Sequence, residues 1–189
     1  MKKNPLVWLL IIFLVGAALY HFVPLKKKRS KNPSLMTAKE AWQKIKPIAE
    51  NKLVGKNARL GEIIGSSLDQ DGLSHRWIFV YYAQGSRQNY LDSYSFTWEK
   101  TGIKTDQQEF IASGLSANYR QKLPDHWLDS DQLAKLVKDL FIGEKHGLYV
   151  SLYWDAGVNP KNPTWFVRKF SSEPNEKTLI DAVTGDKLN

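Results

Sequence analysis

Apolar and polar residues alternate most regularly between residues 90 and 98. Every second side chain there is aromatic, apart from Asp92, and the side chains between them are leucine, serine or threonine. This period of two predicts a half-buried strand of an antiparallel sheet. The preceding run, residues 76–83, is apolar on both faces and predicts a central strand. Residues 58–68 predict a third strand.

Two helices are predicted from apolar residues at a period near 3.6. The first begins at Thr37, because Thr37 and Glu40 have the spacing of a capping box. Pro47 predicts a kink or a split in this helix. The second begins at Asp129 and Ser130, and its apolar stripe is typical of a helix that lies on a sheet. The stripe consists of Leu133, Leu136, Val137, Leu140 and Phe141.

Three more strands are predicted after the second helix, at residues 148–154, 164–170 and 177–183. Residues 103–126 show little periodicity, and we expect one short strand and a connection there. The order of one helix followed by three strands therefore occurs twice in the chain. Trp77 and Trp165 hold the same place in the two copies, which supports a repeat.

The N-terminal residues 6–25 are apolar and carry no formal charge. A helix of that length spans about 30 Å, which is enough to cross the hydrocarbon core of a bilayer. An uncleaved membrane anchor is therefore predicted. A cleaved signal peptide is the alternative, with a weak cleavage site at Gly16-Ala17-Ala18.

These patterns together predict an α+β fold in which an N-terminal transmembrane helix precedes two helix-plus-antiparallel-sheet units. Residues 1–31 would comprise a short tail, the anchor at residues 6–25 and a basic flank. Residues 32–123 would form the first unit, which is divergent, and residues 124–189 the second.

Basic residues are concentrated beside the apolar segment. Seven of the 27 Lys and Arg residues lie within residues 1–36, which contain no Asp or Glu, and this leaves 20 basic against 19 acidic residues elsewhere. Such a balance argues against a nucleic-acid-binding body. The flank predicts contact with anionic lipid headgroups, and its charge favours a cytoplasmic body. Its residues include Lys26, Lys27, Lys28 and Arg29.

The sequence offers no recognisable reactive motif. It lacks cysteine, which excludes disulfides, thiolate metal sites and a cysteine nucleophile. The four histidines, at positions 21, 75, 126 and 146, lack the spacings of a local metal site, so neither a metal nor another cofactor is predicted. Asp69-Gln70-Asp71-Gly72 begins like a calcium loop but lacks the closing acidic ligand, and it predicts a hairpin turn.

Two further groups of side chains have structural interpretations. Asp125, Asp129 and Asp131 lie near a helix start, where acids complement the helix dipole, and this explains them better than general acid–base catalysis does. Aromatic residues of the first strands are expected to fill the core, with a stacking platform for sugars or peptides as the alternative. These residues are Tyr81, Tyr82, Tyr90, Tyr94 and Trp98.

The C-terminal landmarks bear a family resemblance. A helix begins at Asp129, Trp165 opens a strand, and Asp181-Ala182-Val183-Thr184-Gly185 closes the last hairpin. The second unit thereby resembles the PepSY-type domain, a module of thermolysin-type propeptides and of bacterial membrane-anchored and secreted proteins. The first unit shares Trp77 and the order of elements, but Trp98 stands where an aspartate is expected.

The resemblance implies an extracytoplasmic module that packs a helix on an antiparallel sheet, and it therefore favours export of the body against the charge bias of the flank. Binding of a partner or inhibition of a peptidase would be its role. The residue types at the signature positions predict turns and core contacts rather than direct contact with a ligand. The signature positions are Trp77, Asp129, Trp165, Asp181, Thr184 and Gly185.

We therefore predict a non-enzymatic, single-pass membrane protein whose extracytoplasmic body binds a protein or peptide partner, conceivably a peptidase. An exposed edge strand could recruit an extended peptide by strand addition. Two alternatives remain at this point. One is a structural component of envelope assembly, and the other is an enzyme whose site is assembled from dispersed residues.

Overall fold

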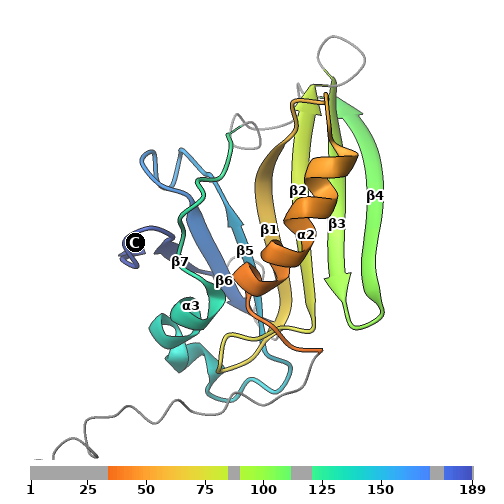
Figure 1. Cartoon of the computed structure of the whole chain (residues 1–189). Helices are drawn as coiled ribbons and strands as arrows, with labels where there is room; N and C mark the ends of the chain where they lie inside the picture. The colour runs from red at the N-terminus through yellow and green to blue at the C-terminus, as the bar shows by residue number, and fades with distance from the viewer. Residues whose placement is uncertain (1–33, 85–89, 112–120, 171–176, 189) are drawn as a thin grey trace, which may run out of the picture. The chain divides into compact units, whose positions relative to one another are not determined.

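The structure is a computed structural model, and it describes residues 34–84, 90–111, 121–170 and 177–188. These residues form two α-helices, one 3₁₀ helix and eight strands (Figure 1). The first helix and its strands are α2 (Ala38–Lys52), β1 (Arg59–Leu68), β2 (Arg76–Gln84), β3 (Tyr90–Glu99) and β4 (Gly102–Ile111). The later elements are α3 (Ser130–Leu136), η3 (Lys138–Phe141), β5 (Leu148–Tyr153), β6 (Thr164–Lys169), β7 (Thr178–Asp181) and β8 (Lys187–Leu188).

All eight strands belong to one antiparallel sheet in the order β4-β3-β2-β1-β5-β6-β7-β8. The predicted fold class, a transmembrane helix followed by two separate helix-plus-sheet units, is therefore wrong. Strands β1 and β5 pair directly, with Ile63 opposite Leu152, and so join what was expected to be two sheets. Pairing of these two strands removes two apolar edges that would otherwise stand open.

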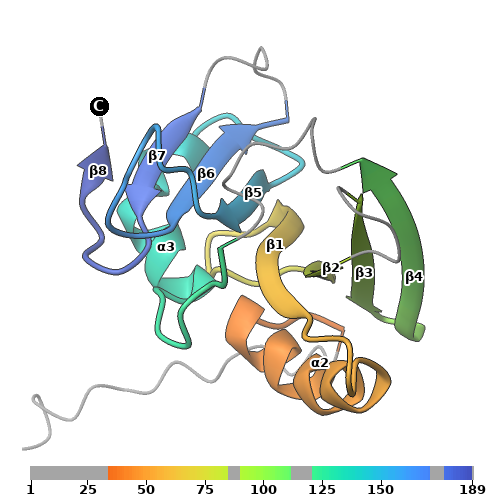
Figure 2. The ribbon, with the colours of Figure 1, turned by 90° about the horizontal axis from the view of Figure 1, so that it is seen from above.

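Both helices lie on the same side of the sheet (Figure 2). The inner face of α2 consists of small residues and Ile45, so the helix approaches the sheet closely. Beneath the helices the largest fully buried side chains include Trp77, Phe79 and Trp165. One continuous apolar core therefore fixes both helices on the sheet.

The first helix begins at Thr37 with the predicted capping box, and both of its hydrogen bonds are present. It continues through Pro47 to Lys52, so the predicted split is absent. A proline at this position removes the hydrogen bond to the carbonyl of Gln43. Both Gln43 and Pro47 are exposed, and water can satisfy that carbonyl.

The second helix is shorter than predicted. Its α-helical part ends at Leu136, and a 3₁₀ turn carries the chain on to Phe141.

Two strands also departed from expectation. β4 is ten residues long rather than short, and β8 was not predicted. Residues 104–109 of β4 are exposed on both faces and so have no apolar period, and this is why only a short strand was expected there.

The predicted localisation, a single-pass membrane protein with an extracytoplasmic body, is corrected as well. Within the ranges that the structure describes, no helix is long and apolar enough to cross a membrane. The predicted span at residues 6–25 and the flank Lys26, Lys27, Lys28 and Arg29 lie outside the described residues.

Candidate functional site

The two signature tryptophans perform the same structural task in the two halves of the sheet. Both side chains are fully buried. The indole Nε1 of Trp77 donates to the carbonyl of Met36 at 2.9 Å, and that of Trp165 donates to the carbonyl of Leu128 at 3.0 Å. Each carbonyl belongs to the residue before a helix N-cap. Each tryptophan therefore fixes the start of one helix on the sheet.

The signature residue Asp129 joins the starts of the two helices. It caps α3, and its Oδ1 accepts from Ser130 N at 2.7 Å and from Lys39 N of α2 at 3.0 Å. The buried hydroxyl of Ser130 accepts from Ala38 N at 2.9 Å and donates to the carbonyl of Gly72 at 2.7 Å. These amides are already bonded, so the helix starts do not form an open anion site.

Asp181 organises the final turn. Its carboxylate accepts from the backbone amides of Val183 and Thr184 at 2.8 and 2.9 Å. The side-chain amides of Asn159 and Asn162 donate to its other oxygen at 2.7 and 2.9 Å. Burial opposes ionisation of Asp181, but these hydrogen bonds outweigh it and hold the pKa of the carboxyl below its usual range. The Asp181 carboxylate is thus engaged in hydrogen bonds that hold the fold.

The last two signature residues complete the same turn. The Thr184 hydroxyl donates to Asp186 Oδ2 at 2.7 Å. Gly185 has φ +84°, a left-handed conformation that glycine adopts without strain. The corresponding glycine of the first half, Gly102, also has positive φ, at +126°. Three of the signature residues, Asp181, Thr184 and Gly185, therefore form one turn, and the other three, Trp77, Asp129 and Trp165, hold the helix starts.

We expect Asp181→Asn to lower the free energy of unfolding by about 1–3 kcal/mol at neutral pH, because an amide group would face hydrogen-bond donors. The folded pKa of Asp181 lies below its unfolded value, so its contribution is present above the unfolded pKa and is lost as pH falls through the folded pKa. The difference in unfolding free energy between the variant and wild type should therefore become smaller at acidic pH. Urea unfolding at neutral pH and at pH ~3 measures this difference. Asp186→Asn removes the same charge from an exposed position and serves as the control.

The other candidates do not converge on a reactive centre. In the described part of the chain, no group of three or more His, Asp or Glu side chains is placed to hold a metal ion. The predicted hairpin turn at Asp69 is confirmed, since Asp69 Oδ1 accepts from the amides of Asp71 and Leu73 at 2.9 and 2.8 Å. Histidines 75, 126 and 146 lie on separate segments of the chain, and position 21 falls outside the described residues.

The aromatic side chains of β2 and β3 fill the core and do not form an open platform. Their described side chains are no more than 8% exposed, and the side chain of Tyr90 is not among those described. Tyr81 packs edge-on against Phe96 with ring centres 5.5 Å apart. The buried aromatics are Tyr81, Tyr82, Tyr94 and Trp98.

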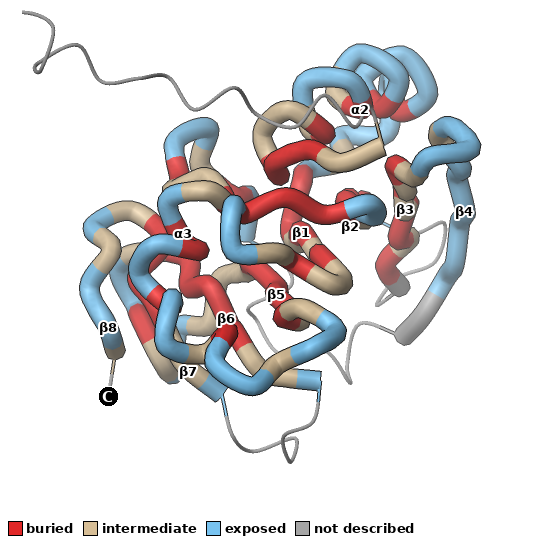
Figure 3. Tube along the Cα trace, turned by 90° about the horizontal axis from the view of Figure 1, so that it is seen from below, coloured by how far each residue is buried: buried red, intermediate tan, exposed pale blue. Residues whose placement is uncertain are grey.

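An accessible polar surface lies at strand β4, the edge of the sheet. Six consecutive residues, Lys104 to Glu109, are exposed, although the neighbouring β3 is largely buried (Figure 3). The register of β4 against β3 is unbroken over ten residue pairs. The strand at the opposite edge, β8, has only two residues. Within the described ranges, a long and regular edge strand therefore lies at one side of the sheet and a two-residue strand at the other.

Backbone groups of β4 point outward at alternate residues. The amide of Gln107 donates to the side chain of Asp106 at 2.9 Å, so it does not face β3. In an antiparallel pair, alternate residues direct both backbone groups to the partner strand. By this alternation, Ile103 and Thr105 share the outward orientation of Gln107. The N–H and C=O groups of these two residues can pair with an added strand.

A cleft of about 360 Å³ lies between this edge and the last turn of α2. Lys52 Nζ donates to Thr105 Oγ1 at 2.8 Å across it. Lys56 Nζ donates to Tyr94 OH at 2.9 Å and lies 4.3 Å from the centre of that ring. The cleft is lined by Lys52, Leu53, Lys56, Tyr94, Phe96, Thr105, Asp106 and Gln107.

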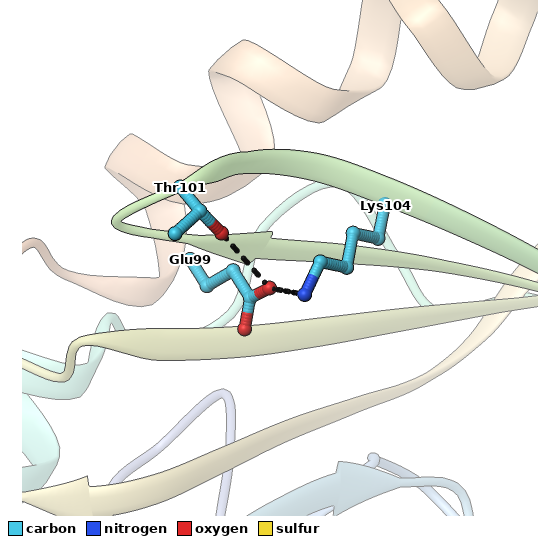
Figure 4. Close-up of polar contacts among 3 residues, drawn as sticks. All are labelled: Glu99, Thr101 and Lys104. Carbon is cyan, nitrogen blue, oxygen red and sulfur yellow. Dashed lines mark hydrogen bonds and ion pairs between the residues drawn. The ribbon is translucent and has the colours of Figure 1, made fainter.

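A polar clamp fixes the turn that leads into β4 (Figure 4). Glu99 forms an ion pair with Lys104 and accepts a hydrogen bond from Thr101 Oγ1 at 3.1 Å. The hydrogen bond from Lys104, followed by that from Thr101, holds the pKa of the Glu99 carboxyl below its usual range. The carboxylate bridges the two strands, because Lys104 lies diagonally opposite Glu99. The beginning of the open edge is thereby held in register.

Comparisons with family models, with curated proteins and with solved structures found no match for this chain. The resemblance to PepSY-type domains therefore stays a prediction. Sequence reasoning anticipated an edge strand that recruits a peptide, but it did not locate β4. The one available signal was Thr101-Gly102, which marks the hairpin turn before the strand.

Proposed function

We propose that this chain is a non-enzymatic binding protein that holds an extended segment of a protein partner by strand addition to β4. The observation that carries the proposal is the ten-residue edge strand, whose side chains from Lys104 to Glu109 are exposed on both faces and whose backbone groups point outward at alternate residues. In strand addition, main-chain hydrogen bonds supply affinity and side-chain contacts supply specificity. The cleft beside Thr105 is suited to the second task.

An edge that merely avoids aggregation is the simpler explanation, and Lys104 and Asp106 are residue types that serve this purpose. Protected edges are typically short, bulged or interrupted by proline. Strand β4 has ten residues, an unbroken register and no proline. Its charged side chains reduce self-association. A partner strand that pairs with Gln107 would replace the hydrogen bond from the Gln107 amide to the Asp106 carboxylate.

The two other predicted functions have less support. No described cleft combines a nucleophile with a hydrogen-bonded base, so an enzyme with a dispersed site gains no support. A structural component of a larger assembly would use an edge in the same way as a binding protein. We therefore retain the predicted protein or peptide partner and propose that it binds by strand addition.

Replacing Thr105 by proline tests strand addition. Proline removes one outward N–H and is tolerated at such a position of an edge strand. Binding of peptides selected from a random ten-residue library on the full-length chain should weaken at least about tenfold, because a hydrogen bond is lost and the ring obstructs the approach. Fluorescence anisotropy with labelled peptides measures this loss.

Thr105→Val is the matched control, since it removes the same hydroxyl but keeps the N–H. Its peptide affinity should stay within about threefold of wild type. Thermal unfolding of both variants checks that β4 remains in place. Equal binding by the proline and valine variants, with both folded, would rule out strand addition at this edge.

A further inference from the structure

Two lysines border the cleft, Lys52 at the end of α2 and Lys56 in the turn that follows, and their electrostatic surroundings differ. The hydroxyl of Tyr94 receives a hydrogen bond from Lys56 and donates to Asp92 Oδ2 at 3.0 Å, so a carboxylate balances Lys56 through one bridging group. In the described part of the structure, Lys52 Nζ donates instead to the neutral hydroxyl of Thr105. Among the described residues, no carboxylate forms an ion pair with Lys52.

The nearby acids of β4 do not supply the missing partner. Asp106 lies on the opposite face of the sheet from Thr105 by register, and its carboxylate accepts from Gln107 N and Gln108 Nε2. Glu109 shares the face of Thr105 but lies four residues along the strand, which is about 13 Å away. On α2 itself, Glu50 pairs with Lys46. Lys52 thus presents an unbalanced charge beside the open edge.

An added strand would bring a side chain to this charge. Residues opposite one another on neighbouring strands have Cβ atoms about 4.5–5.5 Å apart. Lys52 Nζ lies 2.8 Å from Thr105 Oγ1. A side chain opposite Thr105, on the face of α2, therefore falls within reach of Lys52. Side chains on the other face of the added strand would point away from the cleft.

We infer that the partner segment carries an acidic side chain at the position that pairs with Thr105, and that Lys52 binds it in the cleft. This inference rests on the proposed strand addition and adds the chemistry of the partner. Charge complementarity of this kind sets the register of the added strand, because a shift by one residue moves the acid to the opposite face.

The test uses two synthetic ten-residue peptides of alternating threonine and valine, one with glutamate and one with glutamine at the same central position. Wild type should bind the glutamate peptide about three to five times more tightly, the range expected of an exposed ion pair. The difference should shrink at high salt. It should vanish in Lys52→Gln and persist in Lys44→Gln, which removes an exposed lysine outside the cleft.

The outcomes separate the two proposals. Equal affinity of the two peptides for wild type would overturn the acidic partner, and so would a preference that survives in Lys52→Gln. Strand addition would still stand after either result if Thr105→Pro abolishes binding. Binding of neither peptide would contradict both proposals. A dimer in sedimentation that dissociates on Thr105→Pro would show that a second copy occupies the edge, and it would overturn the inference as well.

Discussion

Replacing Gly72 by alanine is expected to lower the free energy of unfolding by about 4 kcal/mol or to prevent folding, through steric overlap and a left-handed backbone. Gly72 has φ +76°, and a Cβ there would lie 2.3 Å from Asp131 Cα and 2.4 Å from the carbonyl oxygen of Ser130. These are backbone atoms at the start of α3, so no side chain can move aside. The carbonyl of Gly72 also accepts the hydrogen bond from the buried Ser130 hydroxyl.

Gly55→Ala is a matched control for this variant. Gly55 has the same φ of +76°, but a Cβ there would meet nothing within 4 Å. It should cost only the left-handed strain, about 1–2 kcal/mol. Chemical denaturation of both variants measures the two costs. A Gly72 variant no less stable than the Gly55 variant would show that the contact between the β1–β2 turn and α3 is looser than described.

Replacing Trp165 by alanine is expected to cost about 3–5 kcal/mol, the range for a large aromatic residue removed from a core. The side chain is fully buried, and its ring packs edge-on against Trp127 with centres 6.0 Å apart. Its indole also holds the carbonyl of Leu128 at the start of α3. The loss therefore combines a cavity with an unpaired acceptor.

Trp165→Phe separates these two contributions. It keeps much of the apolar volume but leaves the Leu128 carbonyl without its donor, and about 1–3 kcal/mol should be lost. Urea unfolding followed by circular dichroism measures both variants. An alanine variant that loses less than about 1 kcal/mol would contradict the assignment of Trp165 to the core.

Local structure could be predicted from the sequence where burial imposes a regular pattern of apolar residues. The alternation in β3 identified its inner face, because Tyr94, Phe96 and Trp98 must all point under α2. The capping box at Thr37 and the helix start expected at Asp129 likewise located both helices, since capping depends on adjacent residues. Such features require only neighbours along the chain, and they were predicted correctly.

Long-range pairing was not readable. Alternation specifies which face of a strand is buried but not which strand lies beside it, so the pairing of β1 with β5 was missed. The open edge was missed for the opposite reason, since the exposed stretch of β4 from Lys104 to Glu109 leaves no apolar period to detect. The residues of the candidate site therefore carry the weakest pattern in the described sheet.

The signature positions illustrate the same division. Trp77 and Trp165 were expected in the core, and Asp181 and Gly185 in a turn, because their side chains suit those places. That the two indoles would each bind the residue before a helix N-cap depends on how helix and sheet meet, which only the structure supplies.

The central claim is that a partner adds a strand to β4, and amide hydrogen exchange of that strand tests it most directly. In the free protein, the outward amides of Ile103 and Thr105 should exchange fast, and the alternate amides bonded to β3 should exchange slowly. On binding the glutamate peptide, the outward amides should become protected at alternate positions, whereas the inward amides change little. Binding that leaves the outward amides in fast exchange would contradict the account.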